Sequence, residues 1–287
     1  MASVRAATFV FLQYLVPKHA LTAVVYHLAR ARWPWLKDLL IRLLVRLYRI
    51  DIEELDRPTP RGFESLNAFF TRPLAPGARP IDQDASAFIS PVDGSVSACG
   101  TINRDQLFQA KGKHYSLIDL LATNVADADD FVGGSFATIY LAPHNYHRVH
   151  APLAGELLSV RHIPGSLFSV NADTVNAIDN LFCRNERLVC RFATSAGAVA
   201  VVFVGALNVG SITTPWTGEL RAGRPVGCEF PIETGTRVSK GDLLGWFNMG
   251  STVILLAEAG RVDWLNDLVP GAVCTMGQSL GTLNGTP

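Results

Sequence analysis

A serine follows a glycine at the start of an apolar run, Met249-Gly250-Ser251-Thr252-Val253-Ile254-Leu255-Leu256. A serine hydroxyl can attack the carbonyl of the preceding residue, and glycine hinders that attack least while tolerating unusual backbone angles. If the resulting ester eliminates and hydrolyses, the chain is cut between Gly250 and Ser251, and Ser251 becomes a pyruvoyl group. The tripeptide also fits a strand in which Gly250 forms a bulge and Ser251 is a polar edge residue, and on its own it favours that interpretation. The other motifs of the chain reverse the preference.

Histidines and an aspartate supply groups that could activate this serine. Three of the seven histidines lie in His144-Asn145-Tyr146-His147-Arg148-Val149-His150, and Asp93 lies in Ser90-Pro91-Val92-Asp93-Gly94. Imidazole titrates near neutral pH, and a carboxylate can orient it and stabilise its charged form. Aspartate, histidine and serine in this order are compatible with a triad that folding brings together.

Several motifs, taken in order, resemble those of the phosphatidylserine decarboxylases, which are pyruvoyl-dependent enzymes of phospholipid synthesis. They are Phe69-Phe70-Thr71-Arg72-Pro73-Leu74 with Arg79-Pro80 after it, the Asp93 and His147–His150 motifs, Gly165-Ser166-Leu167-Phe168-Ser169-Val170-Asn171, Asn185-Glu186-Arg187 and the Gly-Ser-Thr site. The resemblance runs over nearly the whole chain. It departs at Met249, where the family usually has leucine, and at His144, an extra histidine ahead of the usual pair.

The resemblance implies a role for each reactive residue. Ser251 would be the self-cleavage serine and pyruvoyl precursor, giving chains 1–250 and 251–287. His150 and Asp93 would complete the maturation triad, and His147 would be the acid/base of decarboxylation. The pyruvoyl ketone would condense with the amine of phosphatidylserine, and carbon dioxide and phosphatidylethanolamine would be the products. The resemblance also implies a homodimer of cleaved protomers, and no metal ion is expected.

The N-terminal fifty residues carry a basic, leucine-rich pattern. Eight basic side chains against Asp38 give this segment a net charge of +7, although the whole chain has a net charge of zero. Its uncharged runs, Ala6 to Val16 and His19 to Ala29, are too short to span a bilayer, which takes about 20 residues. Six leucines recur at helical spacing and predict an amphipathic helix on an anionic lipid surface: Leu36, Leu39, Leu40, Leu43, Leu44 and Leu47.

The alternative is a helix that packs those leucines on the protein's own core. Trp33 and Trp35 favour the membrane, because tryptophan prefers the interfacial layer. The five cysteines are odd in number and show no Cys-x-x-Cys spacing, which indicates reduced thiols. Together these features predict a peripheral protein on the cytoplasmic face of the inner membrane. Nucleic acid is not an expected partner, because the basic charge lies on a leucine-rich helix and is not interleaved with stacking aromatics.

The pattern changes after the helical end. Prolines punctuate residues 51–91, which are predicted to be a linker wrapped on the core. Short runs rich in branched or aromatic residues then predict strands, with one helix near Asp173 to Leu181; the runs are Phe136 to Leu141, Leu188 to Thr194, Ala198 to Leu207, Gly227 to Ile232, Leu243 to Phe247 and Thr252 to Ala257. The predicted fold is α+β, with a helical membrane-associating segment at 1–57 and a mainly antiparallel, barrel-like catalytic domain at 58–287.

Three other functions fit single features of the chain. Val238-Ser239-Lys240-Gly241-Asp242 resembles a turn of lipoyl and biotinyl carrier domains, but it lacks the flanking residues of their modification sites, and a Gly-Asp turn explains it. Three histidines spaced by three could bind zinc, but on one short strand they would not all point inward. A membrane-associated serine hydrolase could use Asp93, His150 and Ser251, but the Gly-x-Ser-x-Gly turn is missing.

Overall fold

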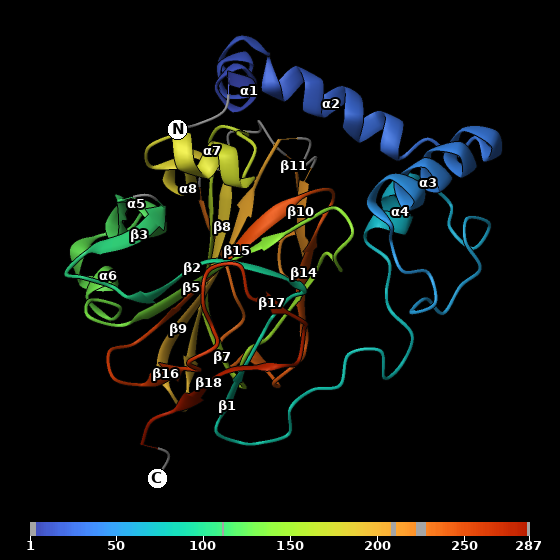
Figure 1. Cartoon of the computed structure of the whole chain (residues 1–287). Helices are drawn as coiled ribbons and strands as arrows, with labels where there is room; N and C mark the ends of the chain where they lie inside the picture. The colour runs from blue at the N-terminus through green and yellow to red at the C-terminus, as the bar shows by residue number, and fades with distance from the viewer. Residues whose placement is uncertain (1–3, 111, 208–210, 222–227, 286–287) are drawn as a thin grey trace.

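The computed structural model describes residues 4–110, 112–207, 211–221 and 228–285. Three helices open the chain and lie across and beside one end of the β structure (Figure 1): α1 (Val4–Leu15), α2 (Lys18–Ala29) and α3 (Pro34–Tyr48). Pro34 suits the first turn of α3, because its missing N–H has no acceptor there in any case. Arg49 ends α3 in the left-handed conformation, with a φ of 52°.

No single helix in the described residues is long and apolar enough to cross a membrane. Ala7–Leu15 and Lys18–Ala29 reach the required length and composition only as a pair, and they are bent by 90° at the break between them.

The largest sheet holds the catalytic serine candidate in its middle. Ser251 is the first residue of β15 (Ser251–Ala257), which lies between β9 (Gly197–Gly205) and β5 (Ser135–Leu141), and every residue of β15 is buried. The strand order is β12-β7-β8-β9-β15-β5-β2-β17, with β13 beside β7; the remaining bounds are β2 (Gly94–Thr101), β7 (Gly155–Ile163), β8 (Arg187–Thr194), β12 (Cys228–Phe230), β13 (Arg237–Val238) and β17 (Val273–Cys274). A run of valine, isoleucine and leucine suits such a central strand, because both of its faces meet side chains of the core.

A smaller sheet carries the histidine motif. Its order is β11-β10-β14-β6, with bounds β6 (Arg148–His150), β10 (Ser211–Thr214), β11 (Gly218–Arg221) and β14 (Leu243–Phe247). Only residues 248–250 separate β14 from β15, so this short turn joins the histidine sheet directly to the serine strand.

Short elements complete the fold. Strands β1 (Ala87–Ile89), β18 (Ser279–Leu283) and β16 (Val262–Trp264) form one sheet, and β3 (Gln106–Ala110) pairs with β4 (Lys113–Ser116). The short helices are α4 (Leu66–Phe70), α5 (Leu117–Leu121), α6 (Val125–Asp129), α7 (Ala172–Ala177) and α8 (Leu181–Arg184).

The expected α+β class with antiparallel strands is confirmed, but the barrel-like shape is not. Among the described residues the large sheet is an open path that ends at β12 and β17. The predicted strands match β5, β8, β9, β12, β14 and β15 within a few residues, although Gly227 lies outside the described residues. The predicted helix at 173–181 is α7, followed by α8. The linker at 51–91 contains α4 and β1, so it is more ordered than its prolines suggested.

The leucines of α3 divide between two environments. A small core forms from Ala29, Ile41, Ile50, Phe63, Leu66 and Phe69, with Leu40 and Leu44 packed against it. Leu39, Leu43 and Leu47 are instead exposed, by 56, 56 and 66%. One side of α3 therefore packs on the protein, as the alternative interpretation expected, and the other side is an apolar row facing solvent.

Candidate active site

The turn before Ser251 has an unusual backbone. Met249 has a φ of 99° and Gly250 a φ of 53°. Glycine adopts such angles freely, whereas a methionine there stores strain of about 1–3 kcal/mol. Ser251 is fully buried, and its Oγ has no hydrogen-bond partner in the described part of the chain. A buried hydroxyl without a partner is costly, and other buried hydroxyls share this state, among them that of Thr252. What sets Ser251 apart is that it directly follows the strained turn.

His147 is a second buried group with an unused atom. It is fully buried, its ring centroid lies 4.1 Å from that of Phe70, and its Nδ1 lies 2.9 Å from the carbonyl oxygen of Asn145. A carbonyl can only accept, so Nδ1 carries the proton and Nε2 is a bare acceptor. Nε2 has no partner among the described residues. Burial lowers the pKa of His147 to about 3, which keeps the ring neutral.

The backbone places His147 near the cleavage turn. The N–H of Phe247, the last residue of β14, donates to the carbonyl of His147 over 3.1 Å. Ser251 follows four residues later in the chain. The nearby sheet residue Leu141, which pairs with Ser251, begins the loop that leads to His147.

His150 has both ring nitrogens occupied. Its Nδ1 donates to the carbonyl of Gly241 over 2.7 Å, and its Nε2 accepts from the hydroxyl of Tyr146 over 3.0 Å. Burial lowers the pKa of His150, while the negative charge of Asp93 opposes that shift. The backbone N–H of His150 donates to the carbonyl of Pro91, and this bond holds β6 beside the Asp93 motif.

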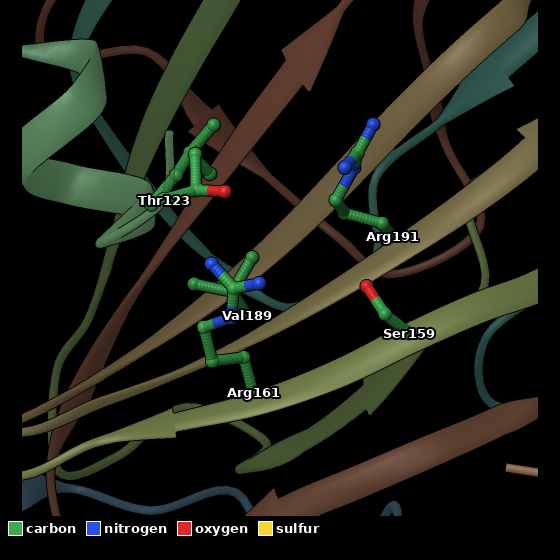
Figure 2. A pocket seen from close by; sticks show the side chains of 6 residues that line it. Thr123, Ser159, Arg161, Val189 and Arg191 are labelled. Atoms are coloured by element: carbon green, nitrogen blue, oxygen red, sulfur yellow. The ribbon is translucent and has the colours of Figure 1, made fainter. Parts of the chain in front are cut away.

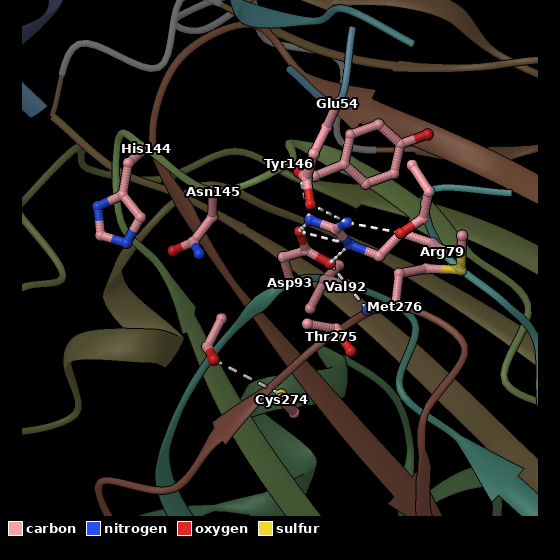
Figure 3. Close-up of polar contacts among 12 residues, drawn as sticks. Glu54, Arg79, Val92, Asp93, His144, Asn145, Tyr146, Cys274, Thr275 and Met276 are labelled. Carbon is pink, nitrogen blue, oxygen red and sulfur yellow. Dashed lines mark hydrogen bonds and ion pairs between the residues drawn. The ribbon is translucent and has the colours of Figure 1, made fainter. Parts of the chain in front are cut away.

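Asp93 is held by an arginine and a backbone amide. Figure 3 shows Arg79 lying between Asp93 and Glu54. Arg79 donates from Nε to both carboxylate oxygens of Asp93 (2.9 and 3.0 Å) and from Nη2 to Oδ2 (2.6 Å). The backbone N–H of Met276 donates to Oδ1 over 2.8 Å. Hydrogen bonds to Asp93 and Glu54 raise the pKa of Arg79.

The structure thus gathers the predicted residues into two groups. Asp93 and His150 lie on neighbouring segments, but each is hydrogen-bonded to other groups, and the described residues show no bond from either to Ser251. Ser251 and His147 each keep a buried atom free. The roles of Asp93, His147, His150 and Ser251 stay predictions. Arg79 and Tyr146 hold parts of this site and were assigned no role from sequence, although both lie in the quoted motifs.

The zinc and carrier interpretations and one small hollow gain no support from the described residues. Among the described residues no cluster of three or more histidine, cysteine, aspartate or glutamate side chains could hold a metal ion. The Nζ of Lys240, the residue that the carrier interpretation would modify, donates a hydrogen bond to the carbonyl of Asp84 over 2.6 Å. Figure 2 shows a hollow beside Ser159, Arg161 and Arg191, but at about 10 Å³ it holds no more than a water molecule.

Comparison with known proteins defines the class to which this fold and site belong. Residues 66–282 match the model of the phosphatidylserine decarboxylase family, and residues 8–49 match a second model described as PSD. Curated relatives named phosphatidylserine decarboxylase proenzyme include those of Methylococcus capsulatus (44% identical, covering 98% of this chain and 99% of the relative) and Halorhodospira halophila (46% identical, 94% and 92%). The protein of Azotobacter vinelandii is 44% identical over 95% of this chain and 97% of its own. The chain therefore belongs to the phosphatidylserine decarboxylase family.

Proposed function

We propose that this protein decarboxylates phosphatidylserine to phosphatidylethanolamine with a pyruvoyl group made from its own Ser251. The observation that carries the proposal is the Met249–Ser251 turn: a strained backbone is followed by a buried serine hydroxyl without a partner, in a chain of this family. The name proenzyme, which its relatives carry, agrees with a chain that must be cut before it works. The carrier and hydrolase alternatives have no comparable support.

Cleavage would begin with the Ser251 hydroxyl. Its oxygen attacks the Gly250 carbonyl carbon as a base takes the proton, the Gly250–Ser251 amide bond breaks, and an ester replaces it. Elimination then releases the Gly250 carboxylate and leaves a dehydroalanine, which water converts to the pyruvoyl end with loss of ammonia. The products are chains 1–250 and 251–287. The strain at Met249 favours this step, because cutting the chain releases it.

His150 and Asp93 are the proposed base and orienting carboxylate of maturation. From the observed arrangement, His150 must give up the Tyr146 hydroxyl before its Nε2 can take the serine proton. Its lowered pKa keeps the ring neutral and able to accept near pH 7. The carboxylate of Asp93 acts on the His150 ring through its charge, and Arg79 fixes the position of that carboxylate.

His147 is the proposed acid/base of decarboxylation. Once formed, the pyruvoyl ketone supplies an electron sink for the pair left behind when the carboxylate departs. His147 would accept a proton at its bare Nε2 from the substrate's ammonium group, which must lose one before its nitrogen can attack the ketone. It would then return that proton to the carbon that carbon dioxide leaves, and its buried surroundings exclude water from both transfers. Phe70 packs on its ring and fixes the direction of Nε2.

The experiment that tests this function is a size measurement of the purified protein. We expect two chains of 250 and 37 residues, the smaller with a blocked, carbonyl-bearing end. Borohydride added with substrate should inactivate the enzyme irreversibly, whereas borohydride should not harm an enzyme that works without a carbonyl group. A single intact chain with full decarboxylase activity would refute the proposal.

The exposed row of α3 supports a position on the membrane surface. Trp35, Leu39, Leu43 and Leu47 repeat every four residues on the solvent side, and Trp33 precedes them. The row is flanked by Arg42 and Arg46, which suits an anionic lipid surface. The described cysteines Cys99, Cys183, Cys190 and Cys274 are free, in keeping with the cytoplasmic face of the inner membrane. The active form is proposed to be a homodimer of cleaved protomers, with segment 1–57 as the membrane unit and 58–287 as the catalytic domain.

A vesicle assay tests the membrane row. Replacing Leu39, Leu43 and Leu47 together with glutamine removes apolar side chains that are already exposed, so folding should survive while sedimentation with anionic vesicles falls at least about tenfold. Deleting the whole segment is a poorer test, because Gln13 of α1 bonds the backbone of Ser169. Val125→Gln, an exposed valine on α6, is the control. Equal vesicle binding by the triple variant and the control would contradict the proposal.

A further inference from the structure

Arg72 is a buried guanidinium without a carboxylate of its own. It is the second residue after α4, and only 3% of it is exposed. Nη1 donates to the carbonyl of Phe69 over 3.4 Å and Nη2 to that of His144 over 3.2 Å, while Nε has no partner in the described residues. Its guanidinium carbon also lies 5.0 Å from the centroid of the Phe69 ring. Two long bonds to neutral carbonyls and an aromatic face are weak compensation for a buried charge, which is normally paired with an opposite charge.

The nearest carboxylates are already engaged. Asp93 and Glu54 both bind Arg79, Glu54 through bonds of 2.7 and 2.9 Å. Burial lowers the pKa of Arg72 to about 10, although the more distant charges of Asp93 and Glu54 oppose that shift. Arg72 therefore stays positive near pH 7 and has an unused donor.

Arg72 lines a cavity of about 230 Å³ whose wall also includes Arg49, Asp51, Asn145 and Tyr146. The cavity adjoins the site, since the carbonyl of Asn145 accepts from His147, and the charge of Arg72 helps lower the pKa of that ring. On its other side, Arg49 and Asp51 directly follow α3, the helix with the exposed leucine row. The cavity thus lies between the proposed membrane contact and the buried histidine.

We propose that this cavity binds the phosphodiester of the lipid headgroup and that Arg72 is its anchoring cation. The inference rests on the proposed function and adds to it the residue that recognises the substrate's phosphate. A guanidinium presents a planar fork that matches phosphate oxygens. The wall also holds Glu54 and Asp93, which Arg79 binds, and Arg49 offsets the remaining carboxylate, Asp51. The position suits a phosphodiester, because that group joins the acyl chains in the membrane to the serine at the reaction centre.

The substrate's own carboxylate is a poorer occupant. An ion pair with Arg72 would stabilise the carboxylate in the ground state, and that charge is lost as carbon dioxide leaves. Binding energy spent there would raise the barrier to decarboxylation. The phosphodiester keeps its charge throughout the reaction, so the same contact helps substrate and transition state equally and appears in KM.

The test compares Arg72→Gln with the wild type on a short-chain, soluble phosphatidylserine. We expect normal splitting into two chains, a KM raised about tenfold or more, and a kcat changed only a few-fold. The KM of Arg72→Lys should lie between those of the wild type and Arg72→Gln, because lysine keeps the positive charge but lacks the planar guanidinium fork. Arg237→Gln, which removes an exposed arginine on β13, is the matched control and should behave as wild type. An unchanged KM in Arg72→Gln would overturn the proposal.

Product inhibition identifies which anion Arg72 holds. Short-chain phosphatidylethanolamine has the phosphodiester but no carboxylate, so Arg72→Gln should weaken its inhibition by the same factor as KM. If KM rises while inhibition is unchanged, Arg72 binds the carboxylate and the proposal fails. If neither variant splits, the wild type decides: glycerophosphoethanolamine should inhibit at least about tenfold more strongly than ethanolamine, and equal inhibition would overturn the site. A wild type that never splits would instead refute the proposed function.

Discussion

The two halves of the candidate site differ in how their polar atoms are satisfied. Both carboxylate oxygens of Asp93 and both ring nitrogens of His150 have hydrogen-bond partners. Arg79 and Met276 bind Asp93, and Gly241 and Tyr146 bind His150. Ser251 and His147 each bury one polar atom that has no partner in the described residues. An unsatisfied buried atom costs about 1–3 kcal/mol, and several other buried side chains carry one, so the state alone does not identify a reactive group. At Ser251 it coincides with the strained turn, and at His147 with a bare imidazole nitrogen. The comparison separates a reactive half, Ser251 and His147, from a second half, Asp93 and His150. In the second half a hydrogen bond, that from Tyr146 to His150, must break before the base can act.

The largest expected effect comes from the reactive half. Ser251→Ala should leave one uncut chain with no measurable decarboxylase activity, because it removes both the nucleophile and the cofactor precursor. Its neighbour Thr252 is a demanding control, since its Oγ1 is also buried without a partner among the described residues. Thr252→Val should still split into chains of 250 and 37 residues on a denaturing gel. Normal splitting of Ser251→Ala would break the comparison.

The two histidines give the next largest effect, because they stand in different halves. His150→Ala should remain one chain, since the serine loses its proposed base. His147→Ala should split and carry the pyruvoyl group, yet release carbon dioxide very slowly, by about 10²–10⁴-fold, as expected for loss of an acid/base. Gels beside a carbon dioxide assay decide between them.

Two other outcomes would change that assignment. If His147→Ala fails to split while His150→Ala splits, the roles are reversed, and the bare Nε2 of His147 is the base for Ser251. If both variants split and stay active, neither imidazole carries the chemistry.

The strands around Ser251 could be predicted from sequence because each one is a local run of branched or aromatic residues. Leu243–Phe247 was predicted with its observed bounds, and β15 began only one residue earlier than expected. Runs of branched residues between glycines leave few alternatives to a buried strand. That the large sheet stays open, with β12 and β17 at its two ends, could not be predicted, because the sequence of a single strand does not specify which distant strand it pairs with.

The site could be predicted in its residue types but not in its bonds. The motif around Asp93 indicated a carboxylate, yet the Arg79 fork and the Met276 amide that hold it come from segments 14 and 183 residues away. Leucine spacing predicted the helix α3, but a periodic pattern does not tell which leucines face the protein. Packing decided that Leu40 and Leu44 turn inward and Leu39 and Leu43 outward.

The smallest expected effect is on stability, and it sharpens the comparison through pH. The pKa of His147 is about 3 in the folded protein, against 6.5 for a free imidazole. Above pH 6.5 the ring is neutral in both states and its full contribution is present. As pH falls from 6.5 toward 3, the unfolded chain takes up a proton that the folded chain refuses, so stability is lost. At pH 5 the loss from this group is about 2 kcal/mol.

Thermal unfolding of uncut protein measures that loss. In a Ser251→Ala background, the melting temperature should fall by several degrees between pH 7 and pH 5, and His147→Gln should make the fall smaller. His150→Gln should change it less, because Asp93 opposes the lowering of the pKa of His150 and the ring already has two partners. An equal pH dependence in the two variants would show that burial treats both imidazoles alike. The difference between the two halves of the site would then rest on hydrogen bonding alone.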